Sequence, residues 1–325
     1  MDRLCFAFSS DENFIVPTYV AMHSLMHFAD KRFDYIIYLL TPSNLPIEQI
    51  DLIKSLESIF DNLEIRIIDM GSAFSESTIV LKHTSIPTMY RLLLAELLPE
   101  YDRCIYVDGD TIVCRDLSNL FTVDMDNNYI GAVRDIEAAK YITGFDYRSR
   151  RPDTTGYINA GVLLMNLRKI REDNLIRDFL ELSKEKLIFA DQDILNIACK
   201  DKILFLELKY NALVKYRFLN YKEDRYAGFI TKYFSVDEIH EAIDNPVIIH
   251  YAQPVKPWHT PYVYKGEYWF DYVKRYISHD VIENWIKKYI LTQECASKIY
   301  FKSVIHMVLY KMGLMRLIIK KRHEI

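Results

Sequence analysis

The stretch that decides the fold is Cys104-Ile105-Tyr106-Val107-Asp108-Gly109-Asp110-Thr111-Ile112-Val113. It begins with a short apolar run, which predicts a buried strand, and the run ends in two aspartates separated by a glycine. Carboxylates at the tip of a buried strand are costly unless they face water or a cation. Because alternate residues of an extended backbone share a side, Asp108 and Asp110 are expected to converge on one divalent ion, with Gly109 permitting the tight path. Carboxylate oxygens suit Mg²⁺ or Mn²⁺, and such ions commonly bind phosphate as well.

Two further triplets have the same spacing, so the pattern alone is not specific. One is Asp124-Met125-Asp126, which lies in a polar stretch with Asn127 and Asn128 and is typical of a turn. The other is Asp191-Gln192-Asp193, which opens a predicted helix. Acidic residues in a first helical turn often serve only as caps, so this triplet has a purely structural interpretation too.

Composition places the chain among globular proteins. It has 325 residues, of which 50% are hydrophobic and only 9 are glycine, so it can bury a sizeable core. The five cysteines are scattered and form no Cys-x-x-Cys pair, which argues against a disulfide framework and a structural zinc site and predicts a cytoplasmic setting. The apolar run before Ser9 is too short for a signal peptide, and no charge-free stretch of 18 residues predicts a spanning helix.

Charge is distributed unevenly along the chain. Residues 298–325 carry seven Lys or Arg against one acid, so the rest of the chain sums to −10 within a net charge of −4. Apolar residues recur at helical spacing in this tail, which predicts a basic amphipathic helix at an anionic membrane surface. The alternative is a helix packed on the body of the protein. We expect an α/β domain over 1–280 and a helical tail over 281–325, and the acidic body argues against nucleic acid as a partner.

Apolar strands alternate with amphipathic helices in the first 70 residues. Strands are expected at 3–8, 35–40 and 63–68, and helices at about 17–28 and 47–60. This alternation predicts an α/β fold with a mostly parallel sheet, in which ligands bind at the carboxyl ends of the strands. The loop at Asp11 and the loop at Asp108 both follow strands, so the two loops are expected to share one crevice.

The second half of the chain adds further candidates. A helix is expected at 88–98, and strands at 129–133, 157–166 and 246–250. Asn159 interrupts the apolar run at 157–166, and a lone Asn there is usually a satisfied core residue. His250 ends the last of these strands, where by itself it resembles a core histidine. Lys256-Pro257-Trp258 follows in a Pro-rich loop.

The order of these motifs resembles the retaining glycosyltransferases of family 8. That group contains bacterial lipopolysaccharide galactosyl- and glucosyltransferases and glycogenin, and the resemblance covers roughly residues 3–270. The residues that carry it are Asp108-x-Asp110, Tyr157-Ile158-Asn159-Ala160-Gly161-Val162, Asp191-Gln192-Asp193 and His250-x5-Lys256-Pro257-Trp258.

The resemblance implies a GT-A fold, a single Rossmann-like mixed and mostly parallel sheet flanked by helices. It also implies transfer of a hexose from UDP-galactose or UDP-glucose to a saccharide acceptor such as lipopolysaccharide or another cell-surface saccharide. The cofactor would be Mn²⁺, which imidazole beside two carboxylates favours over Mg²⁺. Together with the tail, this predicts a protein that is peripherally associated with the inner face of the membrane.

Motif matching assigns expected roles to individual residues. Asp108, Asp110 and His250 would bind the metal, with Gly109 between the aspartates, and Lys256 would meet the diphosphate. Ser9, Asp11 and Asn13 match the loop that holds uracil and ribose. The positions expected to surround the donor sugar are Arg91, Asp135, Asn159, Asp191 and Gln192. Gln253 departs from the family, where a glycine usually lies close to the diphosphate.

The family retains the anomeric configuration, and two routes are open. Gln192 matches the position on the far face of the sugar, but a neutral amide is a poor nucleophile. We therefore favour attack on the same face as UDP departure, with Asp191 orienting sugar hydroxyls rather than forming a covalent intermediate. The rival functions are nucleotidyltransfer onto a sugar phosphate, for which the Gly-rich loop is missing, and an inactive glycan-binding scaffold.

Overall fold

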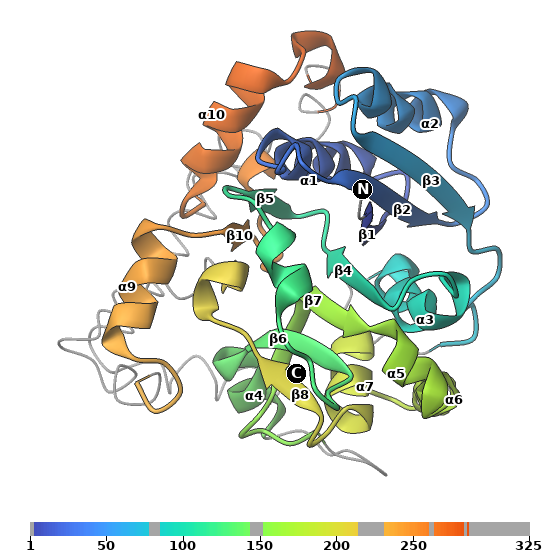
Figure 1. Ribbon diagram of the computed structural model, residues 1–325, viewed down its shortest axis with the longest axis vertical. Coiled ribbons are helices and arrows are strands. Elements are labelled where there is room, and N and C mark those ends of the chain that lie inside the picture. Colours follow the sequence, from blue (N-terminus) through green and yellow to red (C-terminus); the bar gives the residue numbers. More distant parts are fainter. Residues whose placement is uncertain are drawn as a thin grey trace, which may run out of the picture.

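A seven-stranded mixed sheet forms the centre of the molecule (Figure 1). The structure is a computed structural model, and it describes residues 3–77, 85–143, 152–213, 231–259, 263–282 and 285. In spatial order the strands are β3 (Leu63–Asp69), β2 (Asp34–Thr41), β1 (Arg3–Ser9), β4 (Arg103–Val107), β7 (Ile158–Asn166), β6 (Ile130–Arg134) and β8 (Ile203–Phe205). Neighbours are parallel except that β7 runs antiparallel to β4 and β6. The predicted mostly parallel sheet is confirmed.

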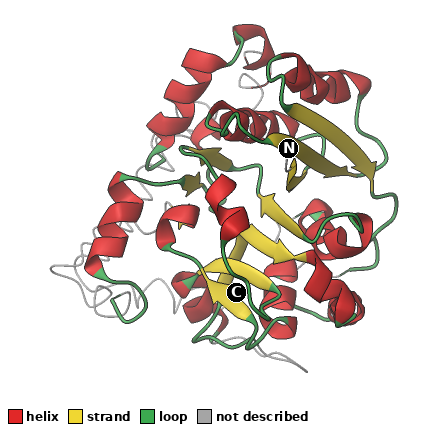
Figure 2. Ribbon diagram, viewed as in Figure 1, coloured by secondary structure: helices red, strands yellow, loops and turns green. Residues whose placement is uncertain are grey.

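Helices cover both faces of this sheet, as Figure 2 shows. The helices of the described residues are α1 (Ile15–His27), α2 (Ile47–Lys54), α3 (Leu94–Leu97), α4 (Ile136–Ile142), α5 (Leu167–Glu172), α6 (Leu175–Leu182), α7 (Ala190–Ala198), α9 (Val236–Asp244) and α10 (Gly266–Tyr276). Alternation along β1 shows how two cores arise. Phe6 and Phe8 pack in the cluster that contains α1 and α10, whereas Cys5 and Ala7 pack in the cluster that contains α3 and α7.

A second, three-stranded sheet extends from the end of β4. Its order is β5 (Thr111–Val113), β10 (Ile248–His250) and β9 (Ala212–Leu213). β10 is antiparallel to β5 and pairs His250 with Thr111, the residue after Asp110. Pairing with this strand therefore places the histidine next to the two aspartates.

Two predicted helices are interrupted by 3₁₀ turns. The helix expected at 47–60 leaves α-geometry after Lys54 and continues as a 3₁₀ segment over Ser55–Ser58. The hydroxyls of Ser55 and Ser58 bond back to the carbonyls of Leu52 and Ser55, which competes with helical hydrogen bonding. The helix expected at 88–98 is a 3₁₀ segment over Ile86–Leu93 followed by α3.

Shorter 3₁₀ segments complete the described structure. They are η3 (Ser118–Thr122), η4 (Leu208–Asn211) and η6 (Pro257–His259). Among the described residues, no helix is long and apolar enough to cross a membrane. The predicted amphipathic segment 298–325 lies outside the described residues, and the division at residue 280 stays a prediction.

Candidate functional site

The Asp108-Gly109-Asp110 triplet is a turn that joins the two sheets. β4 ends at Val107 and β5 begins at Thr111, so the aspartates converge through a turn and not through alternation along one strand. A Cβ on Gly109 would lie 2.2 Å from Thr18 Oγ1 and 3.3 Å from Thr18 Cα of α1. Any larger residue at this position would have to displace the Thr18 side chain, so the close contact favours glycine.

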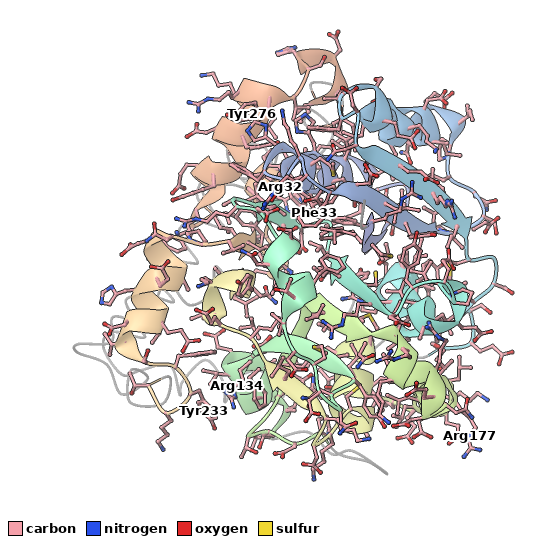
Figure 3. All side chains as sticks on the ribbon, viewed as in Figure 1. Arg32, Phe33, Arg134, Arg177, Tyr233 and Tyr276 are labelled. Carbon is pink, nitrogen blue, oxygen red and sulfur yellow. The ribbon has the colours of Figure 1, made fainter. Side chains whose placement is uncertain are left out.

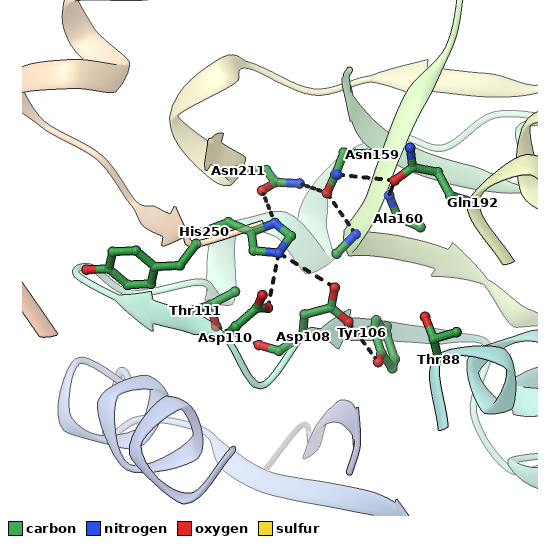
Figure 4. Close-up of polar contacts among 12 residues, drawn as sticks. Thr88, Tyr106, Asp108, Asp110, Thr111, Asn159, Ala160, Gln192, Asn211 and His250 are labelled. Atoms are coloured by element: carbon green, nitrogen blue, oxygen red, sulfur yellow. Dashed lines mark hydrogen bonds and ion pairs between the residues drawn. The ribbon is translucent and has the colours of Figure 1, made fainter. Parts of the chain in front are cut away.

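Asp108, Asp110 and His250 converge at this turn. One ligand atom from each lies within 4.8 Å of the other two, and among the residues that the structure describes no second group of this kind occurs. His250 Nε2 is 3.1 Å from Asp110 Oδ1 and 3.7 Å from Asp108 Oδ2 (Figure 4). The two carboxylates and the imidazole therefore lie together, and their binding of one ion stays a prediction.

Each aspartate has one oxygen turned toward His250 and one bound by a basic side chain. Asp108 Oδ1 accepts hydrogen bonds from Arg91 at 2.8 Å and from the Tyr106 hydroxyl at 3.0 Å. Asp110 Oδ2 accepts from Lys256 Nζ at 2.5 Å. Burial raises the pKa of Asp110, but Lys256 and His250 outweigh it and hold that pKa well below its ordinary value, so this carboxylate stays ionised.

Arg91 connects the Asp108 turn to the start of α7. Its guanidinium is buried over the ring of Tyr106, 4.0 Å from the ring centroid, and its Nε lies 3.1 Å from Asp191 Oδ2. Burial opposes the charge on Arg91, yet Asp108 and Asp191 raise its pKa above the ordinary value. Burial raises the pKa of Asp191 to about 6, although Arg91 and the Thr88 hydroxyl act in the opposite direction.

The three residues of the 191–193 triplet have different surroundings. Asp193 is fully buried, and its Oδ2 accepts the backbone N–H groups of Ile188 and Phe189 at 2.9 and 3.1 Å. This carboxylate holds the chain entering α7, which fits the structural interpretation of the motif. Asp191 and Gln192 instead line the cavity at the Asp108 turn.

Asn159 is a satisfied buried residue that also lines this cavity. Its Nδ2 donates to Asp135 Oδ2 at 3.1 Å and to Gln192 Oε1 at 3.2 Å, and its Oδ1 accepts from the Gly161 amide at 2.9 Å. Gln192 Oε1 also accepts from the Ala160 amide at 3.1 Å. The two interpretations of Asn159 are therefore compatible.

One cavity of about 730 Å³ contains almost all the predicted site residues. Those that line it are Ser9, Asp11, Arg91, Asp108, Gly109, Asp110, Asp135, Asn159, Asp191, Gln192, His250 and Lys256, and Gln253 lies beside them. The predicted crevice shared by the Asp11 and Asp108 loops is present. Asn13 is the exception, because its side chain is exposed and lies outside the cavity lining.

The loop after β1 is organised by Asp11. Its Oδ1 accepts the backbone N–H groups of Asn13 at 3.0 Å and Phe14 at 3.1 Å, so Asn13 contributes its backbone to the loop. Ser9 Oγ bonds the Tyr106 hydroxyl at 2.6 Å. The end of β1 is thus tied to the strand that precedes Asp108.

Three residues of the site were missed from the sequence. Tyr106 lies two residues before Asp108, and alternation along that strand could have identified it. Thr88 lies one turn before Arg91, whose Nε donates to the Thr88 carbonyl at 2.8 Å. Asn211 ends η4 and hydrogen-bonds His250, but no local sequence signal marks it.

A second cavity of about 580 Å³ is lined by residues of β6, β8 and α9. Figure 3 labels Arg134 and Tyr233, which both line it. The guanidinium of Arg134 lies 3.5 Å from the ring centroid of Phe205. Since the only described cluster able to hold a metal is in the first cavity, that cavity is the candidate site.

The chain is similar to known proteins in sequence and in structure. The family model described as "Glycosyl transferase family 8" matches residues 5–261. Glycosyltransferase GlyF of Streptococcus pneumoniae is 29% identical over 263 residues, which cover 79% of this chain and 58% of GlyF. A lipopolysaccharide 1,2-glucosyltransferase of Escherichia coli is 26% identical over 77% of this chain and 71% of its own length. The chain thus spans little more than half of GlyF.

A solved structure has the same fold. The galactosyltransferase LgtC, in complex with donor and acceptor sugar analogs, aligns with a TM-score of 0.65 and 23% identity. The alignment covers 83% of this chain and 95% of LgtC. At this identity the likeness establishes the fold.

Proposed function

Because this chain belongs to glycosyl transferase family 8 and has its GT-A fold, we propose that it transfers galactose or glucose from UDP to a saccharide acceptor. The observation that carries the proposal is the meeting of Asp108, Asp110 and His250 with Lys256 in one cavity. Similarity to a lipopolysaccharide glucosyltransferase supports lipopolysaccharide or another cell-surface glycan as acceptor.

The charge of the cavity supports a divalent cation beside the donor. Its lining has six carboxyl groups against two Lys or Arg side chains, namely Asp11, Asp108, Asp110, Asp135, Glu137 and Asp191 against Arg91 and Lys256. A diphosphate would be repelled by such a surface unless a cation lay between them. Two carboxylate oxygens and an imidazole nitrogen already face one another there, and this donor set suits Mn²⁺, with Mg²⁺ as the second choice. When bound, the metal would offset the negative charge that develops on UDP.

The two basic residues of the cavity, Lys256 and Arg91, have different roles in this proposal. Lys256 Nζ lies between Asp110 Oδ2 at 2.5 Å and the Tyr251 carbonyl at 2.8 Å, so its charge is held next to the metal ligands. From there it would stabilise the departing diphosphate. The guanidinium of Arg91 is buried and forms ion pairs with Asp108 and Asp191. We assign it to holding these two carboxylates in place.

The remaining lining residues would bind the nucleotide and the sugar. We assign Ser9 and Asp11 to the nucleoside, and Asn13 to the backbone of that loop. Asp135, Asn159 and Gln192, which form one hydrogen-bonded group, are assigned to the sugar hydroxyls.

Hydrogen bonding around Gln192 and Asp191 supports attack on the same face as UDP departure. Gln192 Oε1 already accepts two N–H groups, which lowers its ability to attack an anomeric carbon. Asp191 has Arg91 on Oδ2 and the Thr88 hydroxyl on Oδ1 at 2.7 Å. Both oxygens are engaged, so Asp191 is suited to orienting the sugar.

UDP release from a panel of UDP-sugars tests the proposal. With Mn²⁺ and no acceptor, we expect slow hydrolysis of one sugar, abolished by EDTA and by the Asp108→Ala/Asp110→Ala double variant. No release from any donor, together with no metal-dependent UDP binding, would favour the inactive glycan-binding scaffold.

For the tail we propose association with an anionic membrane surface at the cytoplasmic face. Residues 298–325 combine seven Lys or Arg with apolar residues at helical spacing, and each basic residue near such a surface contributes roughly 1 kcal/mol. Deleting 298–325 should weaken binding to anionic liposomes and leave UDP release in solution unchanged. Equal liposome binding by the shortened protein would contradict the proposal.

A further inference from the structure

The orientation of His250 is set by a chain of hydrogen bonds that begins at a backbone amide. The Gly161 N–H can only donate, and it donates to Asn159 Oδ1 at 2.9 Å. The atom of Asn159 at this contact is therefore the carbonyl oxygen. Its own amide nitrogen faces the carboxylate of Asp135 at 3.1 Å, which agrees with the same assignment.

Asn211 continues the chain from Asn159 to His250. It is fully buried, and one end of its amide lies 2.9 Å from Asn159 Oδ1. Since that oxygen accepts, the facing group must be the Nδ2 donor, and Asn211 Oδ1 is left toward His250 Nδ1 at 2.9 Å (Figure 4). An amide oxygen has no proton to give, so the proton in this contact is on Nδ1.

The proton on Nδ1 determines the state of Nε2, the other ring nitrogen of His250. A neutral imidazole has one N–H, so with Nδ1 protonated Nε2 presents a lone pair to Asp108 and Asp110. A lone pair and two carboxylate oxygens within 4.8 Å of one another form a favourable arrangement around a cation.

We propose that Asn211 is a positioning residue that holds His250 in the Nδ1–H tautomer and so prepares Nε2 to bind a divalent cation. This inference rests on the proposed function, in which Asp108, Asp110 and His250 bind a metal. Asn211 touches neither of these carboxylates in the hydrogen bonds of the described chain. It acts through His250, and through Asn159 it joins the metal ligand to Gln192 on the sugar side of the cavity.

The backbone around Asn211 fits this role. Asn211 is the last residue of η4, and β9 begins at the next residue and runs parallel to β10, which carries His250. The pairing of Ala212 with Ile249 keeps the two side chains in register. A rigid pairing between the two segments is what a second-layer contact to a metal ligand requires.

The test compares full-length wild type with Asn211→Leu and Asn211→Asp. One readout is ¹⁵N NMR of the His250 ring in metal-free protein at alkaline pH, assigned with His250→Ala. The other is Mn²⁺ affinity without donor, from the electron paramagnetic resonance signal of free Mn²⁺. We expect Nδ1–H in wild type, loss of a single tautomer in Asn211→Leu, and about 10- to 100-fold weaker Mn²⁺ binding. Asn211→Asp keeps an oxygen opposite Nδ1 and should bind Mn²⁺ more tightly than Asn211→Leu.

Asn166→Leu is the matched control. Asn166 is also a buried asparagine, but it lies at the far end of β7, where its Oδ1 accepts the Lys169 amide at the start of α5. It should lose stability without changing the His250 spectrum or Mn²⁺ affinity, which separates positioning from general destabilisation.

The outcomes distinguish this inference from the proposed function. Wild type that shows Nδ1–H but binds no Mn²⁺ would overturn the metal site and with it the role of Asn211. Wild type that binds Mn²⁺ while Asn211→Leu binds it equally would overturn the positioning role alone. Wild-type spectra with the proton on Nε2 only would also overturn that role, even if Asn211→Leu fails to fold.

Discussion

Asp108-Gly109-Asp110 and Asp124-Met125-Asp126 have the same spacing of carboxylates but opposite surroundings. In the first, both side chains line a cavity and each has one oxygen bound by a basic side chain. In the second, both aspartates are exposed, and Asp124 Oδ1 accepts the Asp126 amide at 2.9 Å. The middle residue differs as well, since Met125 is fully buried in the core and Gly109 packs on Thr18.

The difference shows that a carboxylate pair becomes a site through its neighbours. Arg91 comes from one part of the chain and His250 and Lys256 from another, and of these two turns they bind only the first. They hold the two carboxylates close together in a partly buried place, where an ion is bound more strongly than at the surface, and Lys256 and His250 keep the pKa of Asp110 below its ordinary value. In the second turn the hydrogen bonds of the two carboxylates come from within the turn, from the Asp126 amide and the Asn127 side chain.

The largest expected effect is the loss of activity when the carboxylates of the first turn are neutralised, compared with the same change in the second turn. Asp108→Asn/Asp110→Asn should reduce Mn²⁺-dependent UDP release on the order of 10³-fold, since it removes charge that faces the reaction. Asp124→Asn/Asp126→Asn should keep UDP release within about twofold, as surface substitutions usually do. Steady-state UDP release measures both, and similar losses in the two variants would remove the distinction between the turns.

A second comparison adds one methyl group next to each turn, at Gly161 beside Asp108 and at Gly131 beside Met125. In Gly161→Ala the new Cβ would lie 2.1 Å from His250 Cε1 and 2.8 Å from Asp108 Oδ2. We expect a stability loss of about 1–3 kcal/mol and weaker Mn²⁺ binding. In Gly131→Ala the nearest atoms are at 3.4 Å, and Met125 Sδ is at 3.5 Å, so no clash arises.

Urea denaturation and Mn²⁺ titration of the two alanine variants provide the readouts. Gly131→Ala should change the free energy of unfolding by less than Gly161→Ala and leave Mn²⁺ affinity unchanged. Mn²⁺ affinity in Gly161→Ala equal to that of wild type would show that the metal ligands tolerate the displacement.

The third triplet predicts a pH dependence of stability. Burial raises the pKa of Asp191 from 3.8 to about 6, so between these values the folded state binds a proton that the unfolded chain has released. This contribution to stability is fully present below about pH 4 and is lost as the pH rises through 6. Relative to Asp191→Asn, wild type should lose about 3 kcal/mol of unfolding free energy between pH 4 and 7. Urea denaturation in EDTA measures it, and a difference that does not vary with pH would contradict the expectation.

The smallest expected effect is at the exposed turn. Asp124→Ala removes the acceptor of the Asp126 amide, which should cost about 0.5–1 kcal/mol of stability because water replaces that acceptor. UDP release per folded molecule should not change. A loss of activity without a loss of stability would mean that the second turn has a function that its surroundings do not reveal.

The strands and the order of motifs were accessible from the sequence. The runs that became β1, β2 and β3 are apolar and bounded by polar residues, so their limits were predicted to within one residue. The end of the helix expected at 47–60 was not predicted correctly, because its last turn depends on whether the hydroxyls of Ser55 and Ser58 bond the preceding carbonyls. Local competition of this kind is not visible in hydrophobic periodicity.

The site residues likewise separate into those with a signal in the local sequence and those that depend on tertiary contacts. Asp108, Asp110 and His250 were predicted because their motifs match the family, and the structure brings them together. Asn13 was placed in the site because it matches the family's loop for uracil and ribose, but its side chain is exposed. Asn211 had no signal, since its importance comes from a contact with His250 that pairing of β9 and β10 creates.

By itself the sequence determined the α/β fold and the motifs that identify the family, because strand burial and motif order are properties of local pattern. Only the tertiary structure decided which residues of the three Asp-x-Asp triplets line a cavity and which oxygen of each carboxylate is engaged. Those outcomes depend on residues distant in the chain, such as Arg91 and Lys256. Electrostatic interactions fall with distance in space and not along the sequence, so the chemistry of the carboxylates is settled only when the chain has folded.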